Sequence, residues 1–203
     1  GYPPMNSRNS WIVVLCVALA SPAAHAQSTL DKYLKRSTQG DASTATEKVE
    51  KVFEGPSGYW RVDDNRAGGG SCSVTYEAGP NKAGYVAPTS GSDAAFIVFS
   101  GPAIPPTKAG KNRKMTLYTS SNGQAQAVEA FHAPNTAEKG GGIIFFRLTD
   151  IEAAMADISD VEDIVASLDE AEVFAIAWQG GHKARAAMQE CLRAAPRAAS
   201  ATP

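Results

Sequence analysis

The residues best placed to bind a ligand surround a glycine turn near the C-terminal end of the chain. A predicted strand over 172–178 is followed by two glycines and then by a predicted helix with basic side chains in its first turn. Free N–H groups at the start of a helix, with positive charge nearby, favour an anion. The sequence therefore predicts a weak anion-binding site that consists of Gly180, Gly181, His182, Lys183 and Arg185. The competing interpretation, that the glycines only form a tight turn between strand and helix, weighs more heavily.

The chain carries no familiar hydrolase motif. Phe99-Ser100-Gly101 lacks the first glycine of the G-x-S-x-G motif. Ser120-Ser121-Asn122 and Lys139-Gly140-Gly141 have the S-x-N and K-x-G forms of penicillin-binding enzymes, but no S-x-x-K supplies the nucleophile. His132 ends a predicted strand and His182 begins a predicted helix, where a histidine more often lies at the surface than serves catalysis. We therefore predict no catalytic residues.

Carboxylates are concentrated in one segment, without the spacing of a metal site. Nine acids and no base lie between Asp150 and Glu172. Three of them, Asp157, Asp160 and Asp163, recur every three residues, whereas a calcium loop needs alternate positions and a glycine. This spacing is typical of the solvated face of a helix. We expect no metal and no cofactor.

Size and charge limit the possible classes of protein. The chain has 203 residues, of which a leader and a tail leave enough for a single domain with one core. The formal net charge of −2 provides no field that attracts a polyanion, so nucleic acid is not expected as a partner.

The first thirty residues indicate export. Residues 1–4 precede the first plausible initiator, Met5, and are expected to lie outside the natural protein, as an added scar or an over-long gene start. Residues 5–26 have the pattern of a signal peptide, with an apolar run over 11–20 and small residues before a cleavage point after Ala26. Ten apolar residues span only about 15 Å of a hydrocarbon core of about 30 Å, so a stable membrane anchor is not expected. The sequence predicts a periplasmic or secreted protein.

Cysteine usage agrees with export. Cys16 lies in the predicted leader and would leave with it, so that Cys72 and Cys191 remain as an even pair. In an oxidising compartment the default for such a pair is a disulfide. The alternative, a metal site shared with His132 and His182, lacks metal-ligand spacing.

Strand patterns fill the middle of the chain. Segments 59–63 and 71–77 flank a glycine-rich loop and favour a hairpin, and 94–100 is apolar on both faces like a central strand. An Asn-Gly step predicts a second hairpin, between 114–119 and 124–132. Further strands are expected over 142–148 and 172–178. A sheet built from hairpins is mostly antiparallel.

Helix patterns lie mainly near the C-terminal end. Thr149 and Ser159 each begin a capping-box pattern and predict two short helices in tandem. Their apolar stripe consists of Ile151, Met155, Ile158, Val161, Val165 and Leu168. A final helix follows Gly181 and turns Cys191 toward the core, where it can meet Cys72. The predicted class is α+β, a twisted, mainly antiparallel sheet with the late helices packed on it and one disulfide.

The predicted boundaries leave flexible segments on both sides of the domain. Residues 27–58 are expected to be a loosely docked N-terminal arm, with helical patterns at 30–35 and 46–53. Residues 59–193 form the predicted domain, and 194–203 a disordered tail.

Two short stretches resemble a known group of proteins. The pattern of Trp178-Gln179-Gly180-Gly181, Ala184-Arg185-Ala186-Ala187-Met188 and Cys191-Leu192, with an earlier Cys72-Ser73, is similar to that of small exported proteins of Gram-negative bacteria. This resemblance implies the disulfide and a secreted location, and it implies no reaction.

The expected function is that of a non-enzymatic envelope or secreted domain that binds an envelope protein or a small ligand. The alternatives are a hydrolase with an unrecognised active site and an inhibitor of an exported protease. A hydrolase should show a serine, cysteine or carboxylate beside His132 or His182 in a polar cleft, and a binder of proteins an exposed apolar patch.

Overall fold

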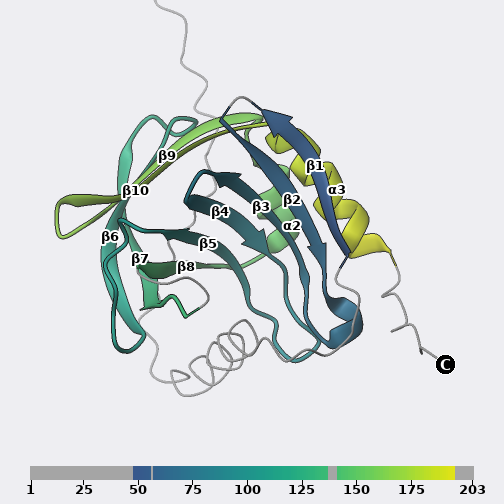
Figure 1. Ribbon diagram of the computed structural model, residues 1–203, viewed down its shortest axis with the longest axis horizontal. Coiled ribbons are helices and arrows are strands. Elements are labelled where there is room, and N and C mark those ends of the chain that lie inside the picture. Colours follow the sequence, from purple (N-terminus) through teal and green to yellow (C-terminus); the bar gives the residue numbers. More distant parts are fainter. Residues whose placement is uncertain (1–47, 56, 137–140, 195–203) are drawn as a thin grey trace, which may run out of the picture.

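The computed structural model describes residues 48–55, 57–136 and 141–194 (Figure 1). The described strands are β1 (Lys48–Gly55), β2 (Gly58–Asp64), β3 (Cys72–Ala78), β4 (Asn81–Val86), β5 (Ala95–Gly101), β6 (Lys111–Thr119), β7 (Ala125–Pro134), β8 (Gly142–Leu148), β9 (Val161–Leu168) and β10 (Ala171–Gln179). The described helices are the 3-10 turn η1 (Arg66–Gly68) and the α-helices α2 (Ile151–Ala156) and α3 (Gly181–Arg193). All ten strands form one antiparallel sheet in the order β1-β2-β3-β4-β5-β8-β7-β6-β9-β10. The predicted signal peptide, residues 5–26, and most of the predicted arm and tail lie outside the described residues.

The predicted α+β class is wrong, because the sheet dominates the described part of the chain. The only α-helices there are α2 and α3, beside the short 3-10 turn η1, and α2 has six residues. Asp150, and not Thr149, is the N-cap of α2: its side chain accepts hydrogen bonds from the backbone N–H groups of Glu152 at 2.8 Å and Ala153 at 3.3 Å. Neither described α-helix is long and apolar enough to cross a membrane.

The second of the two tandem helices is in fact strand β9. Its buried positions alternate, and they are Glu162, Ile164, Ala166 and Leu168. Strand β9 pairs with β10 through a two-residue turn, in which Asp169 and Glu170 have left-handed φ angles of 50° and 67°. Apolar residues at 161, 164, 165 and 168 also fit the stripe of a helix. The sequence is therefore compatible with both a helix and a strand, and pairing with neighbouring strands favours the strand.

The helical pattern over 46–53 is wrong as well. Residues 48–55 form β1, which pairs with β2 from Lys48 opposite Asp64 to Gly55 opposite Gly58. Strand β4 was not predicted, and it follows β3 after a turn at residues 79–80.

The other predicted strands are confirmed. Both predicted hairpins are present, β2 with β3 and β6 with β7, and the apolar segments near 94–100 and 142–148 form the neighbouring strands β5 and β8. The strand predicted over 172–178 is β10, and the helix predicted after Gly181 is α3.

The sheet curves so strongly that its last strand packs across its first half. Strand β10 contacts β3, β4 and β5, while α3 covers the same face of β1, β2 and β3 (Figure 1). Aromatic side chains fill the space between: Trp178 lies 5.4 Å from Trp60 and 6.4 Å from Tyr85, measured between ring centroids, and Phe174 stacks on Phe99 at 4.5 Å. This is the main core of the protein, and we call this face of the sheet the inner face.

The predicted disulfide is confirmed. Cys72 at the start of β3 is bonded to Cys191 in α3, and their Cα atoms lie 6.1 Å apart, within the usual range of about 4.4–6.8 Å. Both residues are buried in the core, as the apolar face of the last helix predicted. The bond fixes α3 against the first half of the sheet and indicates an oxidising environment.

Candidate functional site

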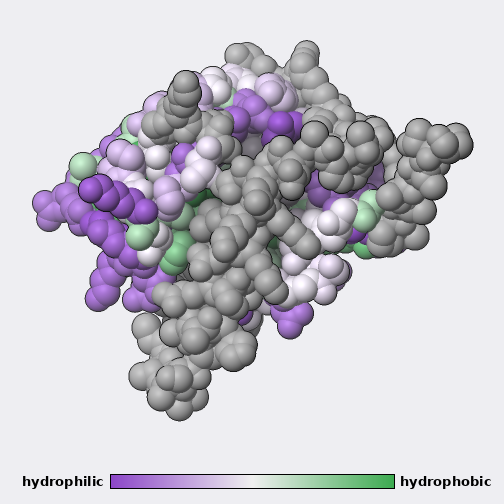
Figure 2. All heavy atoms as spheres, turned by 60° about the horizontal axis from the view of Figure 1, so that its bottom comes forward, coloured by the Kyte–Doolittle hydropathy of each residue, from purple (hydrophilic) through white to green (hydrophobic). Residues whose placement is uncertain are grey.

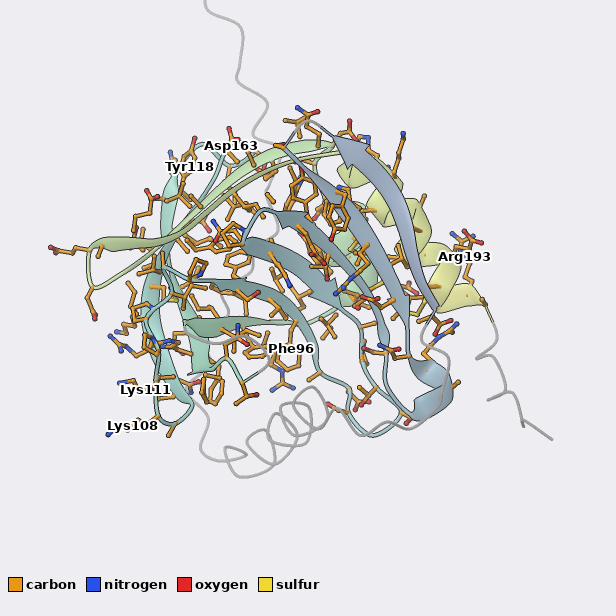
Figure 3. The ribbon with its side chains drawn as sticks, viewed as in Figure 1. Phe96, Lys108, Lys111, Tyr118, Asp163 and Arg193 are labelled. Atoms are coloured by element: carbon orange, nitrogen blue, oxygen red, sulfur yellow. A yellow bond between two sulfur atoms is a disulfide. The ribbon has the colours of Figure 1, made fainter. Side chains whose placement is uncertain are left out.

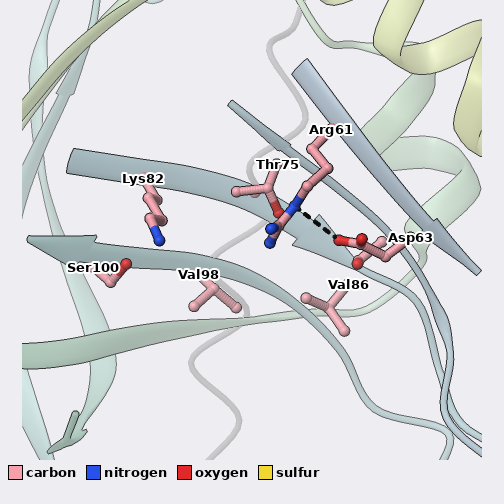
Figure 4. Close-up of a pocket in the computed structure, with 9 residues that line it drawn as sticks. Arg61, Asp63, Thr75, Lys82, Val86, Val98 and Ser100 are labelled. Atoms are coloured by element: carbon pink, nitrogen blue, oxygen red, sulfur yellow. Dashed lines mark ion pairs between the residues drawn. The ribbon is translucent and has the colours of Figure 1, made fainter. Parts of the chain in front are cut away.

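A polar hollow of about 200 Å³ lies on the outer face of the first half of the sheet (Figure 4). Its lining comes from four adjacent strands, β2 to β5: Arg61, Asp63, Ser73, Thr75, Lys82, Gly84, Val86, Val98 and Ser100. Successive side chains of a strand point to opposite faces, so that Trp60 enters the core while Arg61 and Asp63 face outward. The hollow is therefore separate from the main core, on the other side of the same strands.

Strand register brings these residues together. Arg61 pairs with Thr75, Thr75 with Gly84, and Gly84 with Val98, which forms one row across the four strands. In the adjacent row, Lys82 pairs with Ser100. The lining is set by regular antiparallel pairing, so its geometry is that of a rigid sheet.

Gly84 forms the floor of the hollow. A Cβ atom at this position would lie 2.7 Å from both Thr75 Oγ1 and Val74 O, which is closer than real Cβ contacts. Only glycine fits this close approach of β4 to β3, and its missing side chain leaves the space above it open.

Two cations and two carboxylates meet in and beside the hollow. Arg61 Nε lies 3.3 Å from Asp63 Oδ2 and 3.3 Å from Glu77 Oε1. Glu77 Oε2 lies 4.0 Å from Lys82 Nζ and accepts a hydrogen bond of 2.9 Å from the hydroxyl of Tyr59. This hydrogen bond raises the pKa of the Tyr59 phenol, because it exists only while the phenol keeps its proton. The negative charge of Glu77 raises the pKa further. Glu77 thus links both cations.

The Arg61 guanidinium is held from one side. The contact printed for each carboxylate is with its Nε atom, and neither Nη atom donates a hydrogen bond to a described residue. Figure 4 shows the side chain reaching past Thr75 into the hollow. Two Nη groups in one plane can bind a carboxylate through two parallel hydrogen bonds. The arrangement is therefore suited to an anionic group entering from solvent.

The five residues of the predicted anion site do gather at the start of α3, but a carboxylate of the chain already lies there. The Asp160 carboxylate accepts a hydrogen bond of 3.1 Å from the backbone N–H of His182, and its carbonyl accepts one of 3.0 Å from Gly181. Gly180 is left-handed, and a Cβ atom on Gly181 would overlap Ser159 O. Arg185 Nη1 donates to Ala156 O at 3.1 Å. Tight packing explains the glycines, and anion binding here stays a prediction.

The two histidines do not assemble a hydrolase site within the described residues. His132 is 2% exposed, and its Nε2 lies 2.7 Å from Pro105 O, a carbonyl that can only accept. Its Nδ1 has no hydrogen-bond partner among the described residues. His182 lies at the surface, with Nδ1 3.8 Å from Asp160 Oδ1. The K-x-G motif that contains Lys139 is not among the described residues.

The serines of the S-x-N motif support a buried carboxylate. Ser120 Oγ and the backbone N–H of Ser121 each donate to Glu162 Oε1 at 2.7 Å. Burial raises the pKa of Glu162, but hydrogen bonds from Ser121, Ser120 and Ser159 outweigh burial and lower it overall. Ser120 Oγ also accepts from the N–H of Asp163 at 2.9 Å, so this hydroxyl anchors the end of β6 to β9.

The only group of potential metal ligands found in the described residues is Asp64 with the two cysteines. Because the sulfurs of Cys72 and Cys191 are bonded to each other, they are not available as thiolate ligands. Asp64 forms an ion pair with Arg66, with 2.8 Å between Oδ2 and Nη2.

Sequence reasoning missed the hollow because it depends on pairing. The alternation of Trp60 and Val62 with Arg61 and Asp63 is visible in the sequence and indicates an outer polar face. Lys82, however, lies in the unpredicted strand β4, and only the register places it opposite Glu77. No motif in the sequence marks that pairing.

Comparison with protein-family models, with curated proteins and with solved structures gives no match for this chain in any of the three.

Proposed function

We propose that this chain is an exported domain that binds a small ligand through a carboxylate group in the outer hollow of β2 to β5. The observation that carries the proposal is the position of Arg61. Two carboxylates lie at its Nε side, and among the described residues neither Nη group donates a hydrogen bond, so both can bind a ligand carboxylate. Lys82 adds a second positive charge to the lining.

A small ligand fits the described surface better than a protein partner does. Among the residues whose side chains are described, Val161 is the only large apolar residue that is exposed. A large exposed apolar patch would mark a site for a protein partner. Where described residues are visible in Figure 2, hydrophilic side chains predominate and the hydrophobic areas are small.

Export is supported from two sides. The leader pattern of residues 5–26 predicts secretion, and the Cys72–Cys191 disulfide indicates an oxidising compartment. A periplasmic or secreted location agrees with both, and so does the resemblance in the C-terminal segment.

The test is a titration of the protein lacking residues 1–26 with acetate, propionate and benzoate, followed by NMR shifts of its backbone amides. We expect shifts at Thr75 and Gly84, because they lie beside Arg61 in the lining. Arg61→Lys keeps the charge but loses the planar pair of donors, and should weaken binding at least about tenfold, since a hydrogen bond to a charged group contributes about 1.5–3 kcal/mol.

Lys114→Gln is the matched control, because it removes one exposed cation of β6 far from the hollow in the strand order. It should bind the acids like the wild type. Shifts confined to α3, or equal losses in both variants, would overturn the proposal.

A further inference from the structure

A second apolar cluster lies on the outer face of the sheet, apart from the main core. Ala133 and Phe145 are its buried members, and Phe96, Val98, Phe131 and Ile143 pack against them half-buried. The rings of Phe96 and Phe145 meet edge to face, with centroids 5.9 Å apart. Figure 3 places Phe96 on the side of β8 away from β9 and β10. Strands β5, β7 and β8 are therefore apolar on both faces.

Val98 belongs both to this cluster and to the lining of the hollow. The row that begins with Arg61, Thr75 and Gly84 continues through Val98 to Phe145 on β8. Along this row, the outer face is charged at Arg61, has no side chain at Gly84, and is apolar at Val98 and Phe145. Strands are about 4.8 Å apart, so β2 and β5 are separated by about 14 Å, and the Arg61 side chain covers part of that distance.

We propose that the ligand is an amphipathic monocarboxylate, with its carboxylate on the Arg61 Nη groups and its apolar end over Val98. This inference rests on the function proposed above and names the chemical class that the hollow selects. Gly84 provides the passage between the two ends, because it is the position in the row without a side chain.

The charges of the hollow select a ligand with one negative charge. Among the described side chains, the cations Arg61 and Lys82 are matched by the carboxylates Asp63 and Glu77, so these four groups together have no net charge to attract a dianion. A phosphate or dicarboxylate would place its second negative charge near the carboxylates of Asp63 and Glu77, and the repulsion between these like charges would weaken its binding. A purely polar ligand would lose hydrogen bonds to water where it covers the apolar side chain of Val98, and this loss would weaken its binding.

The experiment compares acetate, butyrate, hexanoate and octanoate on the disulfide-bonded protein without residues 1–26, by calorimetry and NMR. We expect affinity to rise up to about fourfold for each added methylene until the tail passes Val98, because each buried methylene adds favourable transfer free energy. Inorganic phosphate should bind more weakly than hexanoate.

Val98→Thr tests the contribution of the apolar end of the ligand to binding, because it preserves the size of the side chain and makes it polar. It should remove most of the rise in affinity from butyrate to octanoate. Val165→Thr, a half-buried valine of β9, is the control and should keep the wild-type series. Thermal unfolding of both variants verifies that they fold.

The same chemistry could come from a free acid or from the C-terminus of a peptide. Short peptides that end in phenylalanine, with a free carboxylate or as the amide, distinguish the two sources. Binding of the free-carboxylate peptide supports a peptide terminus, and binding of the fatty acids alone supports a free acid. Equal binding of the amide contradicts the inference.

The failures can be told apart. If no acid binds in a manner that depends on Arg61, the proposed function is wrong. If all acids bind with Arg61 dependence but with equal affinity, the proposed function stands and the amphipathic class is wrong.

Discussion

Trp60 on β2 donates its indole N–H to the carbonyl oxygen of Gln179 on β10 at 2.7 Å, although the two residues are 119 positions apart. Asn81 Nδ2 on β4 makes a similar bond of 2.9 Å to Ala175 O. Strand β10 is the last strand of the sheet, so these carbonyls lie on the side that lacks a neighbouring strand. Side chains of the first half of the sheet therefore provide the hydrogen bonds that another strand would have given.

Trp60→Phe tests this closure. The substitution keeps an aromatic ring in the core but removes the donor to Gln179 O, and Trp60 is fully buried. We expect a loss of about 1–3 kcal/mol in the free energy of unfolding, from the carbonyl left without its donor and from the smaller ring. Urea denaturation measures the loss. A variant as stable as the wild type would show that this bond does not contribute.

Replacing Cys72 by Ala should lower the free energy of unfolding by about 2–5 kcal/mol, because the bond closes a long loop of the unfolded chain. Cys191→Ala should have the same effect, and the double variant should add little to either. Denaturation of the three variants measures this. Two free thiols in denatured, unreduced protein that lacks residues 1–26, and with them Cys16, would contradict the assignment of the bond.

Glu162 should make the protein sensitive to acid. Its pKa is lowered in the folded state, because the hydrogen bonds from the serines outweigh burial. Its contribution is therefore fully present above the unfolded value of about 4.3 and is lost as the pH falls through the folded pKa. The free energy of unfolding, measured from pH 7 to pH 2, should fall less steeply in Glu162→Gln. Glu172→Gln, at an exposed position of β10, should follow the wild type. Parallel curves for all three proteins would refute the role of Glu162.

The turn between β9 and β10 stores a backbone cost that glycine can relieve. Glu170 has a φ of 67° and carries a side chain, whereas a turn of this kind prefers glycine at its second position. Glu170→Gly should raise the free energy of unfolding by about 0.5–1 kcal/mol after the extra freedom of glycine in the unfolded chain is counted.

Gly123 provides the reverse control for that turn. It has a φ of 68°, and a Cβ atom added there would have no neighbour within 4 Å, so Gly123→Ala meets the backbone cost alone. This variant should lose about 1 kcal/mol of stability. A lower melting temperature for Glu170→Gly would contradict the argument.

Local patterns were sufficient for most strands and insufficient for β9. Alternation around 59–63 and the Asn-Gly step before residue 124 specify hairpins without outside help. At β9, Ser159 and Glu162 imitate a capping box, yet the structure uses Glu162 as a buried acceptor for Ser120. Ser120 lies 42 positions before Glu162 in the sequence, so the local pattern around Glu162 cannot indicate this contact.

The candidate site was out of reach for a related reason. A hollow on a sheet arises from side chains on neighbouring strands, and a shift of one residue in register would turn every one of them to the other face. The disulfide could be predicted because it needs only two cysteines and a compartment. The Arg61 hollow needs the exact pairing of four strands, which no local signal specifies.

The bond between Cys72 and Cys191 also determines how the protein withstands proteolysis. It joins the start of β3 to α3, so all the strands from β3 to β10 lie inside one covalent ring. A single cut in that ring, for example at the turn that contains Gly123, leaves two fragments that stay linked and migrate as one chain until a reductant is added. A nicked molecule would therefore keep both parts of its sheet together in an oxidising environment.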